Sequence, residues 1–557
     1  MSSDDTLTFL ALGGAGEIGM NMYLYGTGPK GQERYLLVDC GVTFPTMDTT
    51  PGVELIMADP AFIAARKDRL DGIVITHAHE DHVGALGFLW PQLEAPVYAR
   101  RFTALIAGQK LEKAGLDPTT VRLAPAWPET VEIGAFRVGF LPLSHSVPEA
   151  SGIVIETKAG RIVHTGDFKL DPTPLVGEAY DPALLDALGE AGVRALVCDS
   201  TNVFSPNPGR SEASIVADVE QLMREARGLV VATTFASNIA RLRTLARAAA
   251  AAGRSVCVAG RAMQQMIQNG FAAGVLPDFP DTVDLRDTGN VPRDKLFVLA
   301  TGSQGERRAV TAQLAGGSYQ GLTLGPGDTF LFSSKTIPGN EVPVAWVLNQ
   351  LSANGVRVID DSDGRYHVSG HANRPDLEEV HRRLRPATVI PMHGEHRHLA
   401  AHAALARENG IEAVVAPNGA MVELMDGAAQ IADHVEAGRV YADGAQLIGA
   451  FDGVVRDRIR LALRGHVVVS LMLEADASMI SGAWVEVLGL PDPDDGPLGE
   501  ALEAHVDNAL GRAASKVLDD DEALERLVVK AVQTESNSLV GKKPVVTVMI
   551  NRFDAGA

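Results

Sequence analysis

The stretch "ITHAHEDH" at residues 75–82 constrains the fold of this chain more than any other feature. Three histidines and an aspartate fall within six positions, directly after the apolar run that ends at Ile75. Because side chains alternate between the two faces of a strand, four ligands this close cannot share one face. A loop between a strand and a helix can aim them in two directions, and the following "VGALGFLW" can begin a helix. We therefore predict a strand-loop-helix in which one metal ion faces His77 and His79, and a second faces Asp81 and His82.

Further ligand types stand after other apolar runs. His145 follows "LPLS", Asp167 lies in "IVHTGD", and His393 lies in "VIPMHGE". Each alone is a weak signal, because a single histidine at a strand end is commonly a surface or core residue. Placed at strand ends one after another, they form a set that completes two metal sites. A carboxylate such as Asp167 can bridge two cations, and two such ions can activate a water and clamp a phosphoryl group.

The pattern of the sequence changes along its 557 residues, a length that accommodates several domains. Residues 1–206 alternate short β-rich runs with turns, whereas residues 207–365 alternate longer helical segments with strands and predict a separate α/β domain. The β-rich pattern returns in residues 366–425, so we expect the first domain to resume there after an insertion. Residues 426–455 predict an irregular linker, and residues 456–557 predict a small α/β domain.

A glycine motif near the N-terminus points to a different chemistry. Gly14, Gly16 and Gly19 spell G-x-G-x-x-G, and Asp39 stands 20 residues beyond the last glycine, which is the spacing of a dinucleotide site. Such a site needs a helix after the third glycine, because the pyrophosphate rests on the N-terminus of that helix. Here six residues lead into the turn-rich "GTGPKG", which leaves no room for a helix. We predict a strand-turn-strand unit instead.

Composition excludes several classes of protein. No run approaches 18 consecutive apolar residues, and the acidic start "MSSDDTLTF" lacks the basic region of a secretory signal, so we expect a cytoplasmic protein without a membrane span. Cys40, Cys198 and Cys257 are far apart and form no C-x-x-C, which favours a reducing compartment without disulfides. The net charge of −21 argues against a general affinity for polyanions. A nucleic-acid substrate would therefore need positive charge that is local or supplied by bound metal.

The H-x-H-x-D-H loop, followed by His145 and Asp167, resembles the metallo-β-lactamase superfamily. The inserted module and the strings "DSTNVFSPNPGRSE", "HVSGHA" and "PMHGE" are similar to its β-CASP nuclease branch. Within that branch the chain resembles the bacterial ribonuclease J family along essentially its whole length, and "GGAGEIGMN" resembles that family's opening strand-turn-strand. The resemblance implies an α/β fold: a metallo-β-lactamase αββα sandwich with an inserted α/β β-CASP domain and a small C-terminal α/β domain.

The resemblance also implies roles for individual residues. One metal ion would be held by His77, His79 and His145, the other by Asp81, His82 and His393, with Asp167 bridging them. Asp199 in "CDST" would support the metal loops, and His371 would lie near the scissile or terminal phosphate, so that Asp81, Asp167, Asp199 and His371 form the catalytic set. The substrate-binding loop would consist of His367, Val368, Ser369, Gly370 and His371.

The string "TTFASN" has two interpretations. Phe235, Ser237 and Asn238 could stack a terminal base and bond its phosphate, because aromatic rings accept any base face. Alternatively, the string is a turn at a strand end with a helix N-cap at Ser237.

The function implied by the resemblance is metal-dependent hydrolysis of RNA phosphodiester bonds. The enzyme would be a 5′→3′ exonuclease that prefers 5′-monophosphate ends of single-stranded RNA, with endonucleolytic cleavage as a second mode, and would act in RNA maturation and decay. It would use two divalent ions, Zn²⁺ or alternatively Mn²⁺, because His/Asp sites accept either. Its C-terminal domain would form a homodimer or homotetramer, and RNA-decay proteins would be its partners.

Three alternatives remain open. A DNA-directed β-CASP nuclease is hard to separate by motifs, because nothing in the sequence marks contacts to a 2′-hydroxyl. A small-substrate hydrolase of the same fold would not need the inserted module or the "HVSGHA" loop. A catalytically silent RNA-binding scaffold would not need the complete set of metal ligands.

Overall fold

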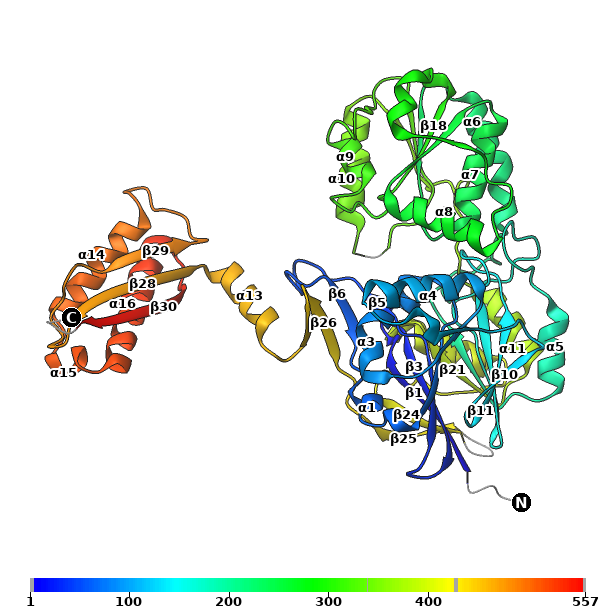
Figure 1. Ribbon diagram of the computed structural model, residues 1–557, viewed down its shortest axis with the longest axis horizontal. Coiled ribbons are helices and arrows are strands. Elements are labelled where there is room, and N and C mark those ends of the chain that lie inside the picture. The colour runs from blue at the N-terminus through cyan, green and yellow to red at the C-terminus, as the bar shows by residue number, and fades with distance from the viewer. Residues whose placement is uncertain (1–4, 338, 425–428, 554–557) are drawn as a thin grey trace. The chain divides into compact units, whose positions relative to one another are not determined.

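The computed structural model describes residues 5–337, 339–424 and 429–553. The chain forms two compact units (Figure 1), the first made of Met1–Thr43 and Met57–Arg439 and the second of Phe44–Ile56 and Val440–Ala557. In the described part of the chain, no helix combines the length and apolar character needed to cross a membrane.

Two sheets packed face to face form the core of the first unit. Phe9, Tyr23 and Leu36 from one sheet and Phe140 and Ile153 from the other are fully buried in a shared apolar cluster. In spatial order the first sheet contains β25 (Ala429–His434), β24 (Ala420–Leu424), β1 (Asp5–Gly13), β3 (Met22–Pro29), β4 (Arg34–Val38), β7 (Leu70–Val74), β8 (Val97–Ala99) and β9 (Val121–Leu123). The second contains β10 (Thr130–Ile133), β11 (Phe136–Pro142), β12 (Ser151–Thr157), β13 (Gly160–His164), β14 (Ala195–Asp199), β21 (Thr388–Met392) and β23 (Glu412–Ala413).

Helices cover the outer faces of both sheets. The first sheet is covered by α3 (Leu86–Leu93) and α4 (Arg101–Lys113), and the second by α5 (Pro182–Glu190), α11 (Arg374–Leu384) and α12 (His396–Glu408) (Figure 1). Leu188, Leu384 and Ala403 of these last three helices pack with Leu196 and Val389 of the sheet beneath them. The predicted αββα sandwich is therefore confirmed.

The inserted domain lies between two neighbouring strands of the second sheet. The chain leaves after β14 and returns at β21, which pairs with β14 in parallel. The intervening residues build a parallel sheet flanked by α6 (Val216–Glu225) and α7 (Ile239–Ala251) on one side and by α9 (Val310–Ala315) and α10 (Glu341–Ala353) on the other (Figure 1). Its strands, in spatial order, are β17 (Thr282–Val283), β16 (Ser255–Ala259), β18 (Leu296–Ala300), β15 (Val230–Thr233), β19 (Thr329–Phe332) and β20 (Arg357–Ile359). The predicted α/β insertion is confirmed.

The second unit contains the C-terminal α/β fold. Its sheet has the order β29 (Trp484–Leu488), β28 (His466–Glu474) and β30 (Val545–Phe553), with α14 (Leu498–Gly511) and α16 (Asp521–Val540) packed against it. Alternate residues of β28 point toward the helices, where Val467, Val469 and Leu471 join Leu502 and Val528 in one cluster. The small C-terminal α/β domain is thus confirmed.

The segment 426–455 differs from the irregular linker that we predicted. It contains β25 as well as β26 (Arg439–Asp443) and β27 (Gln446–Gly449), which form an antiparallel hairpin, while residues 426–428 lie outside the described residues. The strand β25 is at the edge of its sheet and most of its residues are exposed. An exposed edge strand needs no apolar alternation, so its sequence lacks the usual strand pattern.

The glycine motif forms the predicted strand-turn-strand. β1 and β3 pair antiparallel, with Leu10 opposite Leu24. In the turn between these strands, Gly14, Gly16 and Gly19 all have positive φ. At Gly14 a Cβ atom would lie 2.3 Å from the hydroxyl of Tyr23, so only glycine fits. The Gly14 carbonyl accepts a hydrogen bond from the backbone N–H of His393 at 2.7 Å. The turn therefore supports a predicted metal ligand rather than a nucleotide.

Candidate metal centre

Side chains from separate loops meet at one end of the sandwich, where strands of both sheets end. Both sheets are parallel or mixed at their centres, so neighbouring strands deliver their following loops to a common edge. The contributing residues are His77, His79, Asp81 and His82 after β7, His145 after β11, Asp167 after β13, and His393 after β21.

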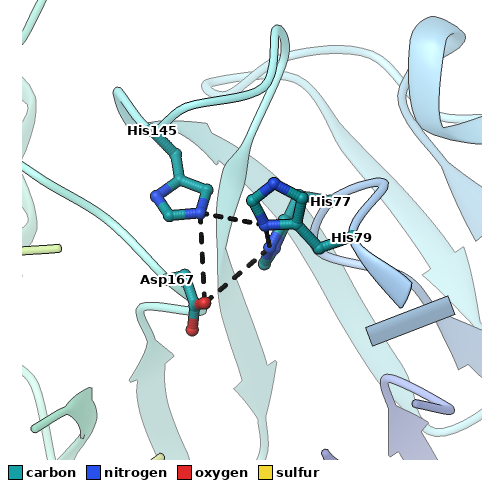
Figure 2. A group of neighbouring side chains, drawn as sticks. All are labelled: His77, His79, His145 and Asp167. Atoms are coloured by element: carbon teal, nitrogen blue, oxygen red, sulfur yellow. Dashed lines mark hydrogen bonds and ion pairs between the residues drawn. The ribbon is translucent and has the colours of Figure 1, made fainter. Parts of the chain in front are cut away.

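Three imidazoles converge on one side of Asp167, and we call His77, His79 and His145 the histidine group (Figure 2). Nδ1 of His79 lies 3.1 Å from Nε2 of His77 and 3.2 Å from Nε2 of His145. Oδ2 of Asp167 lies 3.9 Å from Nε2 of His77 and 4.0 Å from Nε2 of His145. The four atoms surround a common point, as the ligands of a tetrahedral ion do.

The environment of the histidine group favours neutral imidazoles. Burial lowers the pKa of all three side chains, that of His79 to about 4, and repulsion between neighbouring imidazoles adds to the effect for His77 and His145. Nδ1 of His145 lies 2.5 Å from the carbonyl oxygen of Gly370. Because a carbonyl can only accept, the proton of His145 sits on Nδ1, which leaves the Nε2 lone pair facing the common point.

A second cluster lies on the other side of Asp167, and we call Asp81, His82 and His393 the carboxylate group. Nε2 of His393 lies 3.2 Å from Oδ2 of Asp81, and Nε2 of His82 lies 3.3 Å from Oδ2 of Asp167. Burial works against protonation of His393, yet the carboxylates of Asp167, Asp199 and Asp81 outweigh it and raise its pKa to about 10. The pKa of His82 is raised in the same way, by Asp167, Asp81 and Asp39 against burial.

Asp167 belongs to both clusters, and its charge state and hydrogen bonds show whether a cation fits there. Burial raises the pKa of a carboxyl group, but here His393, His82 and His371 together hold the pKa of Asp167 well below its usual range. Within the described residues its buried Oδ1 accepts no hydrogen bond, although Nδ1 of His393, which points to Thr201, lies 3.3 Å from it. A buried carboxylate oxygen without a donor is costly unless a cation binds it. Each cluster, with Asp167, has its ligand atoms within 4.8 Å of one another, so these residues fit divalent metal ions.

Asp39 is a functional residue that the ligand motifs do not reveal. Nδ1 of His82 donates to Oδ2 of Asp39 at 2.7 Å, and Asp39 also accepts from the backbone N–H of Thr76 at 2.8 Å. This carboxylate fixes the ring of His82 and leaves Nε2 facing Asp167. The sequence could have indicated Asp39 only by its position directly after β4. That strand pairs in parallel with β7, which precedes the histidine loop.

Thr201 holds His393 in a similar way. Its hydroxyl donates to Oδ1 of Asp199 at 2.7 Å and lies 2.8 Å from Nδ1 of His393. Since the single hydroxyl proton is given to Asp199, the hydroxyl oxygen accepts from His393. Asp199 therefore supports the carboxylate group through Thr201.

The predicted substrate loop lies directly against the metal centre. Nδ1 of His371 lies 2.8 Å from Oδ2 of Asp199, and Asp199 and Asp167 overcome burial to raise the pKa of His371. Nδ2 of Asn202 donates to the hydroxyl of Ser369 at 2.8 Å, which ties the loop to the segment after β14. Beside the loop is a small cavity whose walls include His145, Ser146, Lys169, Asn238, Val368, Ser369 and Gly370.

Comparison with known proteins gives matches over the whole chain. Four family models match: the metallo-beta-lactamase superfamily at residues 16–206, the ribonuclease J beta-CASP domain at 227–351, the Zn-dependent metallo-hydrolase RNA specificity domain at 365–417, and the ribonuclease J C-terminal domain at 453–553. Ribonuclease J of Sinorhizobium meliloti is 40% identical over 99% of this chain and 98% of its own length. The chain belongs to the ribonuclease J family. Ribonuclease J of Mycolicibacterium smegmatis is 37% identical over 86% of this chain and 85% of its own.

Membership in the ribonuclease J family establishes the enzyme class. The protein is a metal-dependent ribonuclease, a hydrolase that binds RNA, which sets aside the small-substrate and DNA-directed alternatives. A solved structure of a protein of unknown function from Enterococcus faecalis V583 shares the fold, with a TM-score of 0.51 and 15% identity over 75% of this chain and 100% of that one.

The segment Phe235–Asn238 forms the turn and helix N-cap of the second interpretation, and its contact with a terminal nucleotide stays a prediction. Asn238 caps α7, since its side-chain oxygen accepts from the backbone N–H of Arg241 at 2.9 Å. The helix N-cap is therefore Asn238, and the alternative that placed it at Ser237 is wrong by one residue. Asn238 also lines the cavity beside the substrate loop, whereas Phe235 and Ser237 are half-buried in the turn before the helix.

Proposed function

We propose that this ribonuclease is a 5′→3′ exonuclease that starts at 5′-monophosphate ends, with endonucleolytic cleavage as a second mode, in cytoplasmic RNA maturation and decay. The observation that carries the proposal is the cavity between the substrate loop and the histidine group. It is small, it adjoins a predicted metal ligand, and its lining includes hydroxyl, amide and ammonium groups. The two carboxylates in its lining, Asp171 and Glu212, are already paired with Lys169 and Arg241. These features suit a terminal phosphate more than an internal stretch of chain.

In this proposal the histidine group would hold one metal ion and the carboxylate group the other, and Asp167 would be available to both. The nitrogen and carboxylate donors suit Zn²⁺, with Mn²⁺ as the alternative. When bound, such a pair of ions supplies Lewis acidity and a nucleophile at neutral pH. Asp39 and Thr201 orient the rings of His82 and His393 so that their Nε2 atoms face Asp167 and Asp81 and would be available to an ion.

His371 is the proton carrier of the proposed mechanism. Its Nδ1–H points at Asp199, which stabilises the imidazolium and raises the pKa of His371. The second nitrogen, Nε2, is then the one that gives a proton to the leaving oxygen or hydrogen-bonds the phosphate. Asp199 acts as the group that orients this ring and keeps it charged.

The loop His367–His371 is the proposed end sensor. Val368, Ser369 and Gly370 line the cavity. Ser369 offers a hydroxyl, and Gly370 has no side chain that would keep a phosphate away from its backbone N–H. Lys169 is buried and paired at 2.9 Å with Asp171, which lines the same cavity. The ammonium therefore offers a fixed hydrogen-bond donor to a phosphate oxygen rather than net positive charge. In a protein of net charge −21, the attraction for a polyanionic substrate would then come mainly from the bound metal ions.

Two further elements of the proposal concern assembly and the terminal nucleotide. The C-terminal α/β domain would form the homodimer or homotetramer interface, and RNA-decay proteins would bind the assembled enzyme. Phe235 and Ser237 would contact the terminal nucleotide, next to Asn238 at the cavity wall.

The test is a comparison of RNA ends. The purified protein is incubated with one single-stranded RNA that carries a 5′-monophosphate, a 5′-triphosphate or a 5′-hydroxyl, and with matched DNA, with and without a chelator. We expect mononucleotides from the monophosphate RNA first, with no product after chelation or in Asp81→Ala.

Asp117→Ala serves as the control, because it removes an exposed carboxylate from a surface turn outside the metal centre. Equal rates on all three RNA ends, or products that are internal fragments alone, would contradict the proposed end-dependent mode.

A further inference from the structure

Arg241, in the first turn of α7, is a fully buried arginine whose donors reach three separate segments. Its Nε and Nη2 atoms donate to Oε1 and Oε2 of Glu212 at 2.5 and 2.9 Å. Its Nη1 donates to the carbonyl oxygens of Ser333 at 2.9 Å and Tyr366 at 3.0 Å, and lies 3.3 Å from Nδ1 of His367.

The partners of Arg241 mark the two places where the chain crosses between the sandwich and the inserted domain. Glu212 lies on the outgoing crossing, and its backbone N–H donates to Oδ2 of Asp171 in the sandwich at 3.0 Å. Tyr366 and His367 lie on the returning crossing, immediately before the substrate loop. Ser333 follows β19 of the inserted sheet and also donates its hydroxyl proton to the Tyr366 carbonyl at 2.6 Å.

Stability alone is a poor explanation for this arrangement. A buried ion pair loses in desolvation much of what it gains in attraction, and apolar replacements of such pairs are often as stable. What a planar guanidinium adds is geometry, because its donors leave in fixed directions and can bind several acceptors at once. Arg241 uses this fork to hold the outgoing crossing, the returning crossing and the end of β19 in one register.

We infer that Arg241 is a positioning residue that sets the substrate loop against the metal centre. By fixing Tyr366 and His367, it determines where Ser369 and Gly370 lie relative to His145, whose Nδ1 donates to the Gly370 carbonyl. The inference rests on the proposed role of the loop in binding the RNA end. Asp171 extends the same network, since it accepts from the Glu212 backbone and pairs with Lys169 at the cavity.

The inserted domain offers a matched control for a test of Arg241. Arg254 is also buried, at 5% exposure, and donates to the carbonyls of Met223, Ala226, Gly228 and Leu296. All four acceptors belong to the inserted domain, so Arg254 stabilises that domain without touching either crossing. Arg241→Lys and Arg254→Lys each keep the charge and remove the fork.

The experiment measures kcat and KM of both lysine variants on single-stranded RNA with a 5′-monophosphate or a 5′-hydroxyl, together with their thermal unfolding. We expect Arg241→Lys to lower kcat/KM on the monophosphate RNA by about tenfold or more and to weaken the preference over the hydroxyl RNA. Arg254→Lys is expected to stay within about threefold of wild type at equal fraction folded. Equal losses of kcat/KM in the two variants would overturn the inference.

The double variant Glu212→Leu/Arg241→Met separates positioning from charge balance. It leaves no unpaired buried charge, so we expect it to unfold near the wild-type temperature, while it cannot hold Tyr366 or Ser333. Low kcat/KM in this folded variant supports the inference, and wild-type kcat/KM would overturn it. If the wild-type enzyme shows no preference between RNA ends, the proposed end selectivity is wrong, but the role of Arg241 can still be tested. In that case a larger loss of kcat/KM on hydroxyl RNA in Arg241→Lys than in Arg254→Lys supports the positioning role, and an equal loss contradicts it.

Discussion

The histidine group and the carboxylate group share Asp167, yet the partners behind them differ in charge. The direct partners of the histidine group are neutral: the Gly370 carbonyl at His145, the Ser146 hydroxyl 3.2 Å from Nε2 of His79, and the Thr76 hydroxyl 3.0 Å from Nδ1 of His77. In the carboxylate group, His82 contacts the carboxylate of Asp39 directly. His77 and His393 are alike in that each contacts a threonine hydroxyl that donates to a carboxylate, Thr76 to Asp39 and Thr201 to Asp199.

This difference separates two ways of preparing a site for a cation. The histidine group is already deprotonated, because burial lowers the pKa of its imidazoles. In the carboxylate group the neighbouring carboxylates raise the pKa of His82 and His393. Both imidazoles therefore carry an extra proton, whose positive charge balances the carboxylates in the absence of metal. A metal ion would enter the histidine group without proton loss and would displace protons from the carboxylate group.

Removing the shared ligand is expected to have the largest effect, because it breaks both groups at once. Asp167→Ala takes away the oxygen atoms that face His77 and His145 on one side and His82 and His393 on the other. We expect the metal content to fall and the ribonuclease rate to drop by about a thousandfold or more. Elemental analysis of the purified variant and a rate assay check this. Full metal content in Asp167→Ala would show that the two groups do not depend on a common ligand.

Asp39→Asn is expected to weaken the carboxylate group most, because Asp39 contacts His82 directly and reaches His77 only through the Thr76 hydroxyl. The variant keeps the shape of the side chain but removes the negative charge that holds His82. Loss of such an outer partner lowers metal affinity by about 10- to 100-fold. Ser146→Ala is the matched control, since it removes the neutral partner of His79 in the histidine group and is expected to change affinity by about threefold or less.

Competition with a coloured chelator resolves the two binding steps of these variants. If Asp39→Asn and Ser146→Ala weaken metal binding equally, charge behind the ligands is not what distinguishes the two groups.

The pH dependence of metal binding sharpens the comparison. The pKa of His393 is raised to about 10, so between pH 6 and 8 it carries a proton that an incoming ion must displace. Affinity at the carboxylate group therefore rises with pH, by about tenfold per unit for each proton released. The pKa of His79 is lowered to about 4, so affinity at the histidine group stays nearly flat over the same range. Chelator competition at pH 6, 7 and 8 measures both slopes, and equal slopes would contradict the assignment.

Gly370→Ala is expected to give the smallest effect and to act on the histidine group. An added Cβ would lie 2.7 Å from Cε1 and 2.9 Å from Nδ1 of His145, so the ring must move. We expect a loss of about fivefold in metal affinity at this group, with the carboxylate group unchanged. Gly289→Ala is the control, because its φ is not positive and the new Cβ would have open space around it. A Gly370→Ala enzyme with wild-type affinity at both steps would mean that the loop and His145 move independently.

The fold, and the meeting of the expected metal ligands at one place, were predictable where local sequence carries the information. The loop at residues 75–82 contains four candidate ligands within a few positions, so even one sequence indicates its chemistry. The glycine motif could be told from a dinucleotide site by the absence of a helix after Gly19, which is also visible in the local sequence. The αββα architecture came from resemblance along the whole chain, and the sheets confirm it.

Residues whose role depends on tertiary contacts were not predictable in the same way. Asp39 lies 43 positions before its partner His82, and only the pairing of β4 with β7 brings them together. Arg241 shares its helix with Arg243, which makes a partly exposed pair with Asp278, and nothing in the sequence distinguishes the buried arginine from the exposed one. The edge strand β25 was not predicted because its exposed residues lack apolar alternation.

The hydrogen bond from His145 to the Gly370 carbonyl has a thermodynamic consequence. One of its partners belongs to the histidine group and the other to the substrate loop. An ion at Nε2 of His145 and an RNA end on the loop would therefore act on opposite ends of one hydrogen bond. Binding equilibria coupled in this way are reciprocal: the factor by which the ion strengthens RNA binding is the factor by which RNA strengthens retention of the ion. An enzyme engaged on RNA would then keep its metal under a scarcity that strips the idle enzyme.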